Sequence, residues 1–208
     1  MAKEIAVLVS GGGTNLQSLI DAQQRGELGG GEITAVISTK VGAYALERAA
    51  KAGIPGYVLP RKDFENVPAM TAALVKMLRE LEIDLVVLAG CITIFTEELI
   101  EAYPNAIMNV HPALIPSFCG KGYYGLRVHE EALKYGVKVS GATVHFVTEE
   151  CDGGPIIAQE PVPVLPGDTP EVLQRRIMEQ GVWIALPRAV ALFCQDRITV
   201  EGRTVIIH

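Results

Sequence analysis

Positive charge is in short supply in this sequence. Among its 208 residues, Lys and Arg number 18 while Asp and Glu number 24, which leaves a formal net charge of −6. Broad binding to nucleic acid requires a basic surface that attracts phosphates, so a nucleic-acid partner is not expected. Any anionic ligand of this acidic chain must instead be held by a local device.

Cysteines are few and lie far apart in the chain. The four of them form no C-x-x-C pair, which predicts reduced thiols in a cytoplasmic protein rather than a disulfide framework. No apolar run reaches membrane-spanning length, and residues 1–4 lead directly into a strand-like segment, so neither a membrane partner nor a signal peptide is expected. The cysteines are Cys91, Cys119, Cys151 and Cys194.

The first half of the chain alternates strand and helix signals. Its apolar runs show no alternation with polar residues, which is typical of parallel strands buried on both faces. Strands are predicted at Ile5–Val9, Ile33–Ser38, Gly56–Leu59, Asp84–Gly90 and Ala106–Val110, and helices follow Gly13 and cover 43–52, 68–81 and Glu97–Ala102. This pattern predicts a Rossmann-like α/β fold with a mostly parallel central sheet and helices on both faces.

The second half has a different pattern. A helix near 126–135 precedes two strands, Lys138–Val147 and Pro155–Val164, which a short acidic turn joins into an antiparallel hairpin. A long helix opens at Asp168-Thr169-Pro170 and runs to about Cys194, and a small hairpin turning at Glu201-Gly202 ends the chain. We find no repeat or linker, and therefore expect a single domain over residues 1–208.

A glycine-rich loop follows the first strand. The stretch S-G-G-G-T-N-L-Q leads into a helix whose free N–H groups and partial positive charge suit a phosphate. The loop fits neither a dinucleotide fingerprint, because Leu16 stands where glycine is needed, nor a P-loop. The alternative is a turn in which Thr14 or Asn15 caps the helix without a ligand. The predicted site for a single phosphate comprises Gly12, Gly13, Thr14 and Asn15.

Two hydrogen-bonding side chains lie close together in M-N-V-H-P-A-L-I-P, at the end of a strand. Asn109 and His111 are two residues apart and should point to the same face, while Pro112 tends to end the strand. The alternative is a solvated histidine at a strand end. If the two side chains meet a substrate, an amide and an imidazole can stabilise an oxygen that gains negative charge.

Asp152 lies in the acidic turn between the two later strands. Asp152-Gly153-Gly154 is also an ordinary turn signal, so a purely local role is the alternative. Near His111, its carboxylate should raise the imidazole pKa and keep the ring protonated near neutral pH. Asn109, His111 and Asp152 together would suit acyl transfer without a covalent enzyme intermediate. His145 lies in an apolar strand, as either a satisfied core residue or a supporting group.

Two other chemistries have weaker sequence support. A zinc site from His111, His145 and a cysteine has no H-x-x-x-H or C-x-x-C spacing behind it, so no metal is expected. A cysteine nucleophile at Cys119 or Cys151 has no sequence sign of thiol activation.

Four stretches, taken in order, resemble one family. V-S-G-G-G-T-N-L-Q, L-A-G-C-I-T-I-F, N-V-H-P-A-L-I-P and V-H-F-V-T-E-E-C-D-G-G-P resemble the folate-dependent formyltransferases. The first stretch narrows the resemblance to the phosphoribosylglycinamide formyltransferase branch, the glycinamide ribonucleotide transformylases of purine synthesis. The resemblance spans nearly the whole chain.

The resemblance implies two small-molecule substrates. The formyl donor would be 10-formyltetrahydrofolate and the acceptor the amine of glycinamide ribonucleotide, whose phosphate would lie at the glycine loop. Asn109, His111 and Asp152 would be catalytic, with His145 in support. The phosphate-binding half would cover about 1–105 and the catalytic, folate-binding half about 106–208, in a monomer or homodimer. The folate would be held by Cys91, Ile92, Thr93, Ile94, Phe95, Val147, Thr148, Glu149 and Glu150.

Some positions depart from the family pattern. Many members have an arginine where Thr93 stands and a basic residue within 64–67, and Cys119 replaces a common proline in a lengthened loop. Glu179 and Val182 stand where many members have Lys and Glu. Two alternatives on the same scaffold remain: a formyltetrahydrofolate hydrolase and a phosphate-ligand binding protein without turnover.

Overall fold

The protein is described by a computed structural model of residues 2–208, and Met1 lies outside the described residues. The first half contains β1 (Glu4–Val9), α1 (Thr14–Gln24), β2 (Glu32–Ser38), α2 (Tyr44–Lys51), β3 (Gly56–Val58), η1 (Arg61–Asp63), α3 (Val67–Glu80), β4 (Leu85–Leu88) and α4 (Glu97–Ala102). The second half contains β5 (Ile107–His111), α5 (Arg127–Tyr135), β6 (Val139–Phe146), β7 (Ile156–Pro163), α6 (Pro170–Ile177), η2 (Met178–Val182), α7 (Trp183–Cys194), β8 (Ile198–Glu201) and β9 (Thr204–Ile207).

Seven strands form one mixed sheet in the order β3-β2-β1-β4-β5-β6-β7. The strands from β3 to β5 are parallel, and β6 and β7 add to them in antiparallel orientation. Strands β8 and β9 form a separate antiparallel hairpin. The predicted fold class is therefore confirmed. The C-terminal hairpin turns at Gly202-Arg203, one residue later than expected.

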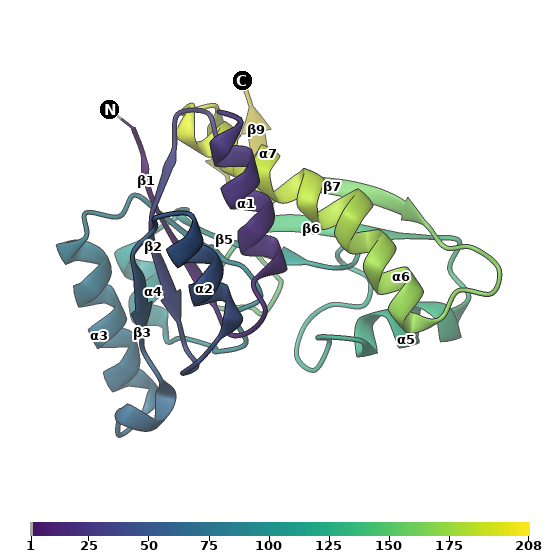
Figure 1. The fold of residues 1–208 in the computed structure, drawn as a ribbon. Coiled ribbons are helices and arrows are strands. Elements are labelled where there is room, and N and C mark those ends of the chain that lie inside the picture. Colours follow the sequence, from purple (N-terminus) through teal and green to yellow (C-terminus); the bar gives the residue numbers. More distant parts are fainter. Residues whose placement is uncertain (1) are drawn as a thin grey trace.

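Helices cover both faces of the sheet (Figure 1). Because strand side chains alternate in direction, Ile5 and Val7 of β1 pack into one core with residues of α1, α2 and α7. Ala6 and Leu8 pack into a second core with residues of α3 and α4 on the opposite face. A third cluster joins α5 and α6 to β6 and β7. The continuous apolar runs therefore mark strands buried on both sides.

The long C-terminal helix is less regular than predicted. Its start agrees with expectation, since the Thr169 side chain accepts a hydrogen bond from the Val172 N–H and Pro170 occupies the first turn. It then consists of α6, a π-helical turn η2 and α7, with Pro187 inside α7. A Cβ at Gly181, in the π turn, would lie 3.2 Å from the Ala142 Cβ of β6. The π turn thus lies where the helix packs closely on the sheet.

The stretch Pro170–Cys194 is long and apolar enough, by length and composition alone, to cross a membrane. The expectation that no stretch reaches this length is wrong by that criterion, although half of the most apolar window is buried within the fold. Buried residues of α7 such as Leu186 and Val190 pack in the core beside β1. A helix that covers a central sheet meets the same criterion, so this finding is weak evidence for a membrane segment.

Candidate active site

The glycine loop connects β1 to α1 at the carboxyl edge of the parallel strands, where open α/β sheets bind ligands. Gly13 is the N-cap residue of α1 and has a positive φ of 73°. Among the described residues, no side chain caps α1 and no acidic residue occupies its first turn. The alternative in which Thr14 or Asn15 caps the helix is therefore wrong. The first N–H groups of α1 remain available to an anion.

Helix α2 makes hydrogen bonds to the glycine loop. The Arg48 Nε–H donates to the Gly12 carbonyl at 2.8 Å, and the Ala45 N–H donates to the Gly11 carbonyl at 3.1 Å. A cavity of about 300 Å³ lies beside the loop, lined by Thr14, Arg48 and Trp183 among others. Arg48 is thus a cation next to the predicted phosphate site that the sequence analysis did not single out.

Asn109, His111 and Asp152 come together from two separate segments. The His111 Nδ1 lies 3.5 Å from Asp152 Oδ2, and the Asn109 Nδ2 lies 3.4 Å from Asp152 Oδ1. The side chains of His111 and Asp152 are only 6% and 9% exposed. Asn109 and His111 share a face of β5, as predicted, because both reach Asp152. The structure therefore brings the three predicted side chains into one largely buried cluster.

His145 belongs to the same cluster. On β6 it lies opposite Asn109, with its Nε2 3.3 Å from Asn109 Nδ2 and 3.6 Å from Asp152 Oδ1. Its Nδ1–H donates to the Phe146 carbonyl at 2.8 Å, which fixes the orientation of the ring. His145 therefore lies between the core and Asp152, in contact with the predicted catalytic residues.

The loop after Pro116 closes over the cluster. The His111 Nε2–H donates to the Phe118 carbonyl at 2.7 Å, and the Gly120 N–H donates to Asp152 Oδ2 at 2.9 Å. The Ile115–Pro116 peptide bond at the start of this loop is cis. The sequence analysis did not predict these two hydrogen bonds, because each is made by a backbone group.

The direction of the His111 pKa differs from expectation. Burial has the largest influence and lowers the pKa of His111, while the Asp152 carboxylate and the Phe118 carbonyl oppose this effect. The prediction that Asp152 keeps the ring protonated near neutral pH is therefore wrong, because the free-energy cost of burying the cation exceeds the stabilisation from these two contacts. For Asp152, burial acts to raise the pKa, but hydrogen bonds from His145 and Gly120 outweigh it and the pKa is lowered.

The two predicted folate segments flank the second core. Cys91 and Phe95 are partly buried against it, whereas Ile92 and Ile94 are 64% and 76% exposed. Val147 packs on the same core, which brings the two segments against one cluster. Thr93 and Thr148 are half-buried, and Glu149 and Glu150 are exposed. The two segments thus present an apolar surface with acidic rather than basic residues at its rim.

Carboxyl groups meet at that rim. A hydrogen bond to Glu149 is the main reason that the pKa of Glu97, at the start of α4, is raised, and the charge of Glu149 adds to it.

Two positions in the last long helix depart from the family pattern. Glu179 is exposed and Val182 is buried in the third core. Val182 therefore contributes to core packing, and it supplies no charged group to the glycine loop.

The alternative chemistries gain no support. Over residues 2–208, no group of three or more His, Cys, Asp or Glu side chains has the geometry of a metal site. Burial and the nearby Asp152 carboxylate raise the pKa of both Cys119 and Cys151. A raised pKa leaves less of the reactive thiolate, which disfavours a cysteine nucleophile.

One buried residue near the cluster escaped sequence reasoning. His129 of α5 is fully buried, and neither ring nitrogen has a hydrogen-bond partner among the described residues. Burial lowers its pKa to about 4, and the neighbouring His111 contributes in the same direction. Its helical spacing resembles that of any core residue, so the sequence carried no signal for it.

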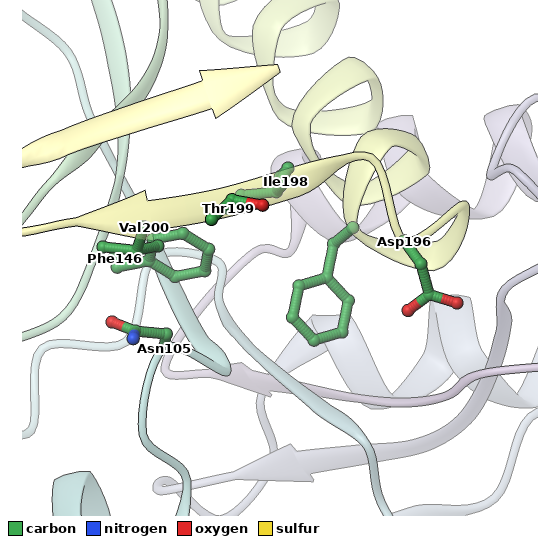
Figure 2. A pocket seen from close by; sticks show the side chains of 7 residues that line it. Asn105, Phe146, Asp196, Ile198, Thr199 and Val200 are labelled. Carbon is green, nitrogen blue, oxygen red and sulfur yellow. The ribbon is translucent and has the colours of Figure 1, made fainter. Parts of the chain in front are cut away.

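A cavity of about 330 Å³ lies under the C-terminal hairpin, and its lining includes none of Asn109, His111 and Asp152. Figure 2 shows Asn105 and Val200 close to the ring of Phe146, with Asp196 in the turn between α7 and β8. Phe146 belongs to the first core, whereas its neighbour His145 turns toward Asp152 on the other face of β6. The sheet therefore separates this cavity from the cluster around Asp152.

The sheet edge and the buried Asn–His–Asp cluster define a site suited to acyl-group transfer on an open α/β fold. A formyl transferase family model matches residues 3–190. The chain belongs to the formyl transferase family. This membership confirms the resemblance inferred from the sequence motifs.

Individual relatives point in the same direction. The chain is 41% identical to phosphoribosylglycinamide formyltransferase of Haemophilus influenzae over 96% of this chain and 91% of that protein. It is 40% identical to the chloroplastic enzyme of that name from Vigna unguiculata, of which it spans only 62%. Among solved structures, glycinamide ribonucleotide transformylase 1 from Symbiobacterium toebii is similar with a TM-score of 0.93 and 43% identity, covering 99% of this chain and 94% of that chain.

Proposed function

We propose that the protein transfers the formyl group of 10-formyltetrahydrofolate to the amine of glycinamide ribonucleotide, a step of purine biosynthesis. The single observation that carries the proposal is the buried cluster of Asn109, His111 and Asp152 at the edge of the sheet that also carries the glycine loop. Both substrates are small molecules. The family membership and the similarity to transformylases support this assignment.

His111 and Asn109 act on the formyl oxygen as the acceptor amine adds to the formyl carbon. The Nε2 of His111 carries the proton, because it donates to a carbonyl in the structure. The same N–H then donates a hydrogen bond to the formyl oxygen, and the Asn109 amide shares the developing negative charge. A hydrogen bond from an uncharged imidazole suffices for this role, in accord with the lowered pKa of His111.

Asp152 assists at the opposite side of the ring. It faces Nδ1, the nitrogen that must gain a proton for the imidazole to become cationic. Its negative charge stabilises that cation while negative charge builds on the formyl oxygen. Asp152 and His111 together relay protons from the attacking amine toward the leaving nitrogen of the folate. His145 holds Asp152 and Asn109 in place.

The loop 117–125 moves before the reaction. The Phe118 carbonyl occupies the Nε2–H that the formyl oxygen requires, so substrate entry displaces this carbonyl from His111. The edge-to-face packing of Phe118 on Tyr135, with ring centroids 6.0 Å apart, stabilises the closed loop. A Tyr135→Ala variant is expected to open the loop more readily and to lower the KM for the folate, as initial rates would show.

The two substrates occupy different halves of a single domain. Gly12, Gly13, Thr14 and Asn15 bind the acceptor phosphate in the half formed by about 1–105. The segments 91–95 and 147–150 hold the pterin, mainly through backbone groups, beside the catalytic half of about 106–208. The enzyme works as a monomer or homodimer in the cytoplasm, without nucleic-acid or membrane partners.

Formyl transfer by the purified protein tests the proposal directly. Folate product and formate are followed separately, with and without glycinamide ribonucleotide. Folate product that forms only when the ribonucleotide is present, without free formate, is the expected result. Formate released without an acceptor would instead identify a hydrolase, and ligand binding without either product would identify a binding protein.

A further inference from the structure

Three strand ends are joined by a chain of buried hydroxyl groups beneath the site. Ser10 follows β1, Thr39 follows β2, and both residues are only 6% exposed. Their hydroxyl oxygens lie 2.7 Å apart. The Thr39 hydroxyl points back to the Val9 carbonyl at 3.5 Å, so Ser10 donates to Thr39. The Ile92 N–H then donates to Ser10 Oγ at 3.1 Å, which extends the chain to the residues after β4.

This chain connects the two predicted substrate sites. Ser10 directly precedes the glycine loop, and Ile92 lies in the folate segment 91–95. That segment forms neither helix nor strand, and its outer side chains are exposed. Two buried hydroxyls anchor it: Ser10 at its start, and Thr71 of α3, which accepts from the Thr96 N–H at 3.2 Å, just beyond its end.

We propose that Ser10 is a positioning residue that couples the two substrate sites, so that filling either site raises the affinity of the other. This inference rests on the proposed function. An anion that orders the glycine loop also fixes the Ser10 hydroxyl, and through it the Ile92 N–H and the backbone of the folate segment. The first ligand to bind then bears the entropic cost of ordering these segments, and the second ligand binds without that cost. Ser10 itself touches neither substrate.

Calorimetry on the full chain tests the coupling. The dissociation constant of glycinamide ribonucleotide is measured alone and with saturating tetrahydrofolate, which carries no formyl group and allows no turnover. The wild-type protein is expected to bind the ribonucleotide about five-fold or more tightly when the folate is present. By reciprocity the ribonucleotide should tighten folate binding by the same factor.

Variants separate coupling from stability. Ser10→Ala and Thr39→Val should bring the affinity ratio close to one, while Thr39→Ser retains the hydroxyl and should preserve the ratio. Thr71→Val loosens only the far end of the folate segment, so it should weaken folate binding with the ratio retained. Ser140→Ala is the matched control, because the Ser140 hydroxyl is buried and has no hydrogen-bond partner among residues 2–208.

The outcomes are distinct. A Ser10→Ala protein that retains the wild-type ratio would overturn the inference, as would a wild-type ratio of one in a protein that transfers formyl groups. A protein that neither transfers formyl groups nor binds the ribonucleotide would overturn the proposed function as well. If Ser10→Ala fails to fold, Thr39→Val decides the question, because it leaves the Ser10–Ile92 bond in place but removes the partner that orients Ser10.

Discussion

Replacing Gly13 by alanine should damage the glycine loop in a way that its neighbour Gly12 does not share. A Cβ added at Gly13 would lie 2.6 Å from the Ala45 Cβ and 2.8 Å from the Ala45 Cα, which is backbone of α2. The φ of Gly13 is also +73°, a conformation that strains an L-residue. Nothing lies within 4 Å of a Cβ added at Gly12.

The magnitude follows from these two effects. Left-handed backbone costs an alanine about 1–2 kcal/mol, and overpacking against a fixed neighbour costs about 1–3 kcal/mol. Reduced freedom of the unfolded chain offsets about 0.5 kcal/mol of this. We therefore expect Gly13→Ala to lower the free energy of unfolding by about 2–4 kcal/mol, unless the loop shifts away from α2 and relieves the contact.

Urea unfolding and steady-state kinetics together test the reasoning. If the loop of Gly13→Ala stays in place, the free energy of unfolding falls. If the loop shifts, its N–H groups no longer fit the phosphate and the KM for glycinamide ribonucleotide rises. Gly12→Ala is the control and should change the stability by less than about 1 kcal/mol. If Gly13→Ala matched Gly12→Ala in both stability and KM, the contact with Ala45 and the phosphate assignment would both lose their basis.

Three further predictions concern the histidines and Asp152. His111→Ala should lower kcat by about 100- to 1,000-fold with the fold retained by circular dichroism, since it removes a donor to the developing oxyanion; near wild-type kcat would exclude His111 from the mechanism. Asp152 acts to raise the pKa of His111 and the proposed mechanism uses the uncharged ring, so Asp152→Asn should shift the acid limb of the pH–rate profile to lower pH, and an unchanged limb would argue against their pairing. The pKa of His129 is about 4 in the folded protein and near 6.5 when unfolded, so folding stability should be fully present above about pH 6.5 and fall by about 3 kcal/mol by pH 4. Denaturant titrations of His129→Leu should lack that loss, and a wild-type pH dependence in this variant would refute the assignment.

Short-range patterns in the sequence accounted for the order and type of most elements. Continuous apolar runs such as Ile5–Val9 predict strands buried on both faces, because each alternate side chain has a core to fill. Residues at helical spacing, such as Leu16, Leu19 and Ile20, are all buried as expected. The motif spacing also predicted a shared face for Asn109 and His111, since side chains two apart on a strand point the same way.

The sequence by itself thus determined the fold class, the family and the side chains that meet in the buried cluster of Asn109, His111 and Asp152. Only the tertiary structure decided their protonation and their partners. The pKa of His111 depends on how deeply β5 is buried and on a carboxylate 41 positions away in the chain, and local patterns carry neither quantity. The bonds from His111 to the Phe118 carbonyl and from the Ile92 N–H to Ser10 likewise involve backbone groups, which every residue possesses and no sequence distinguishes.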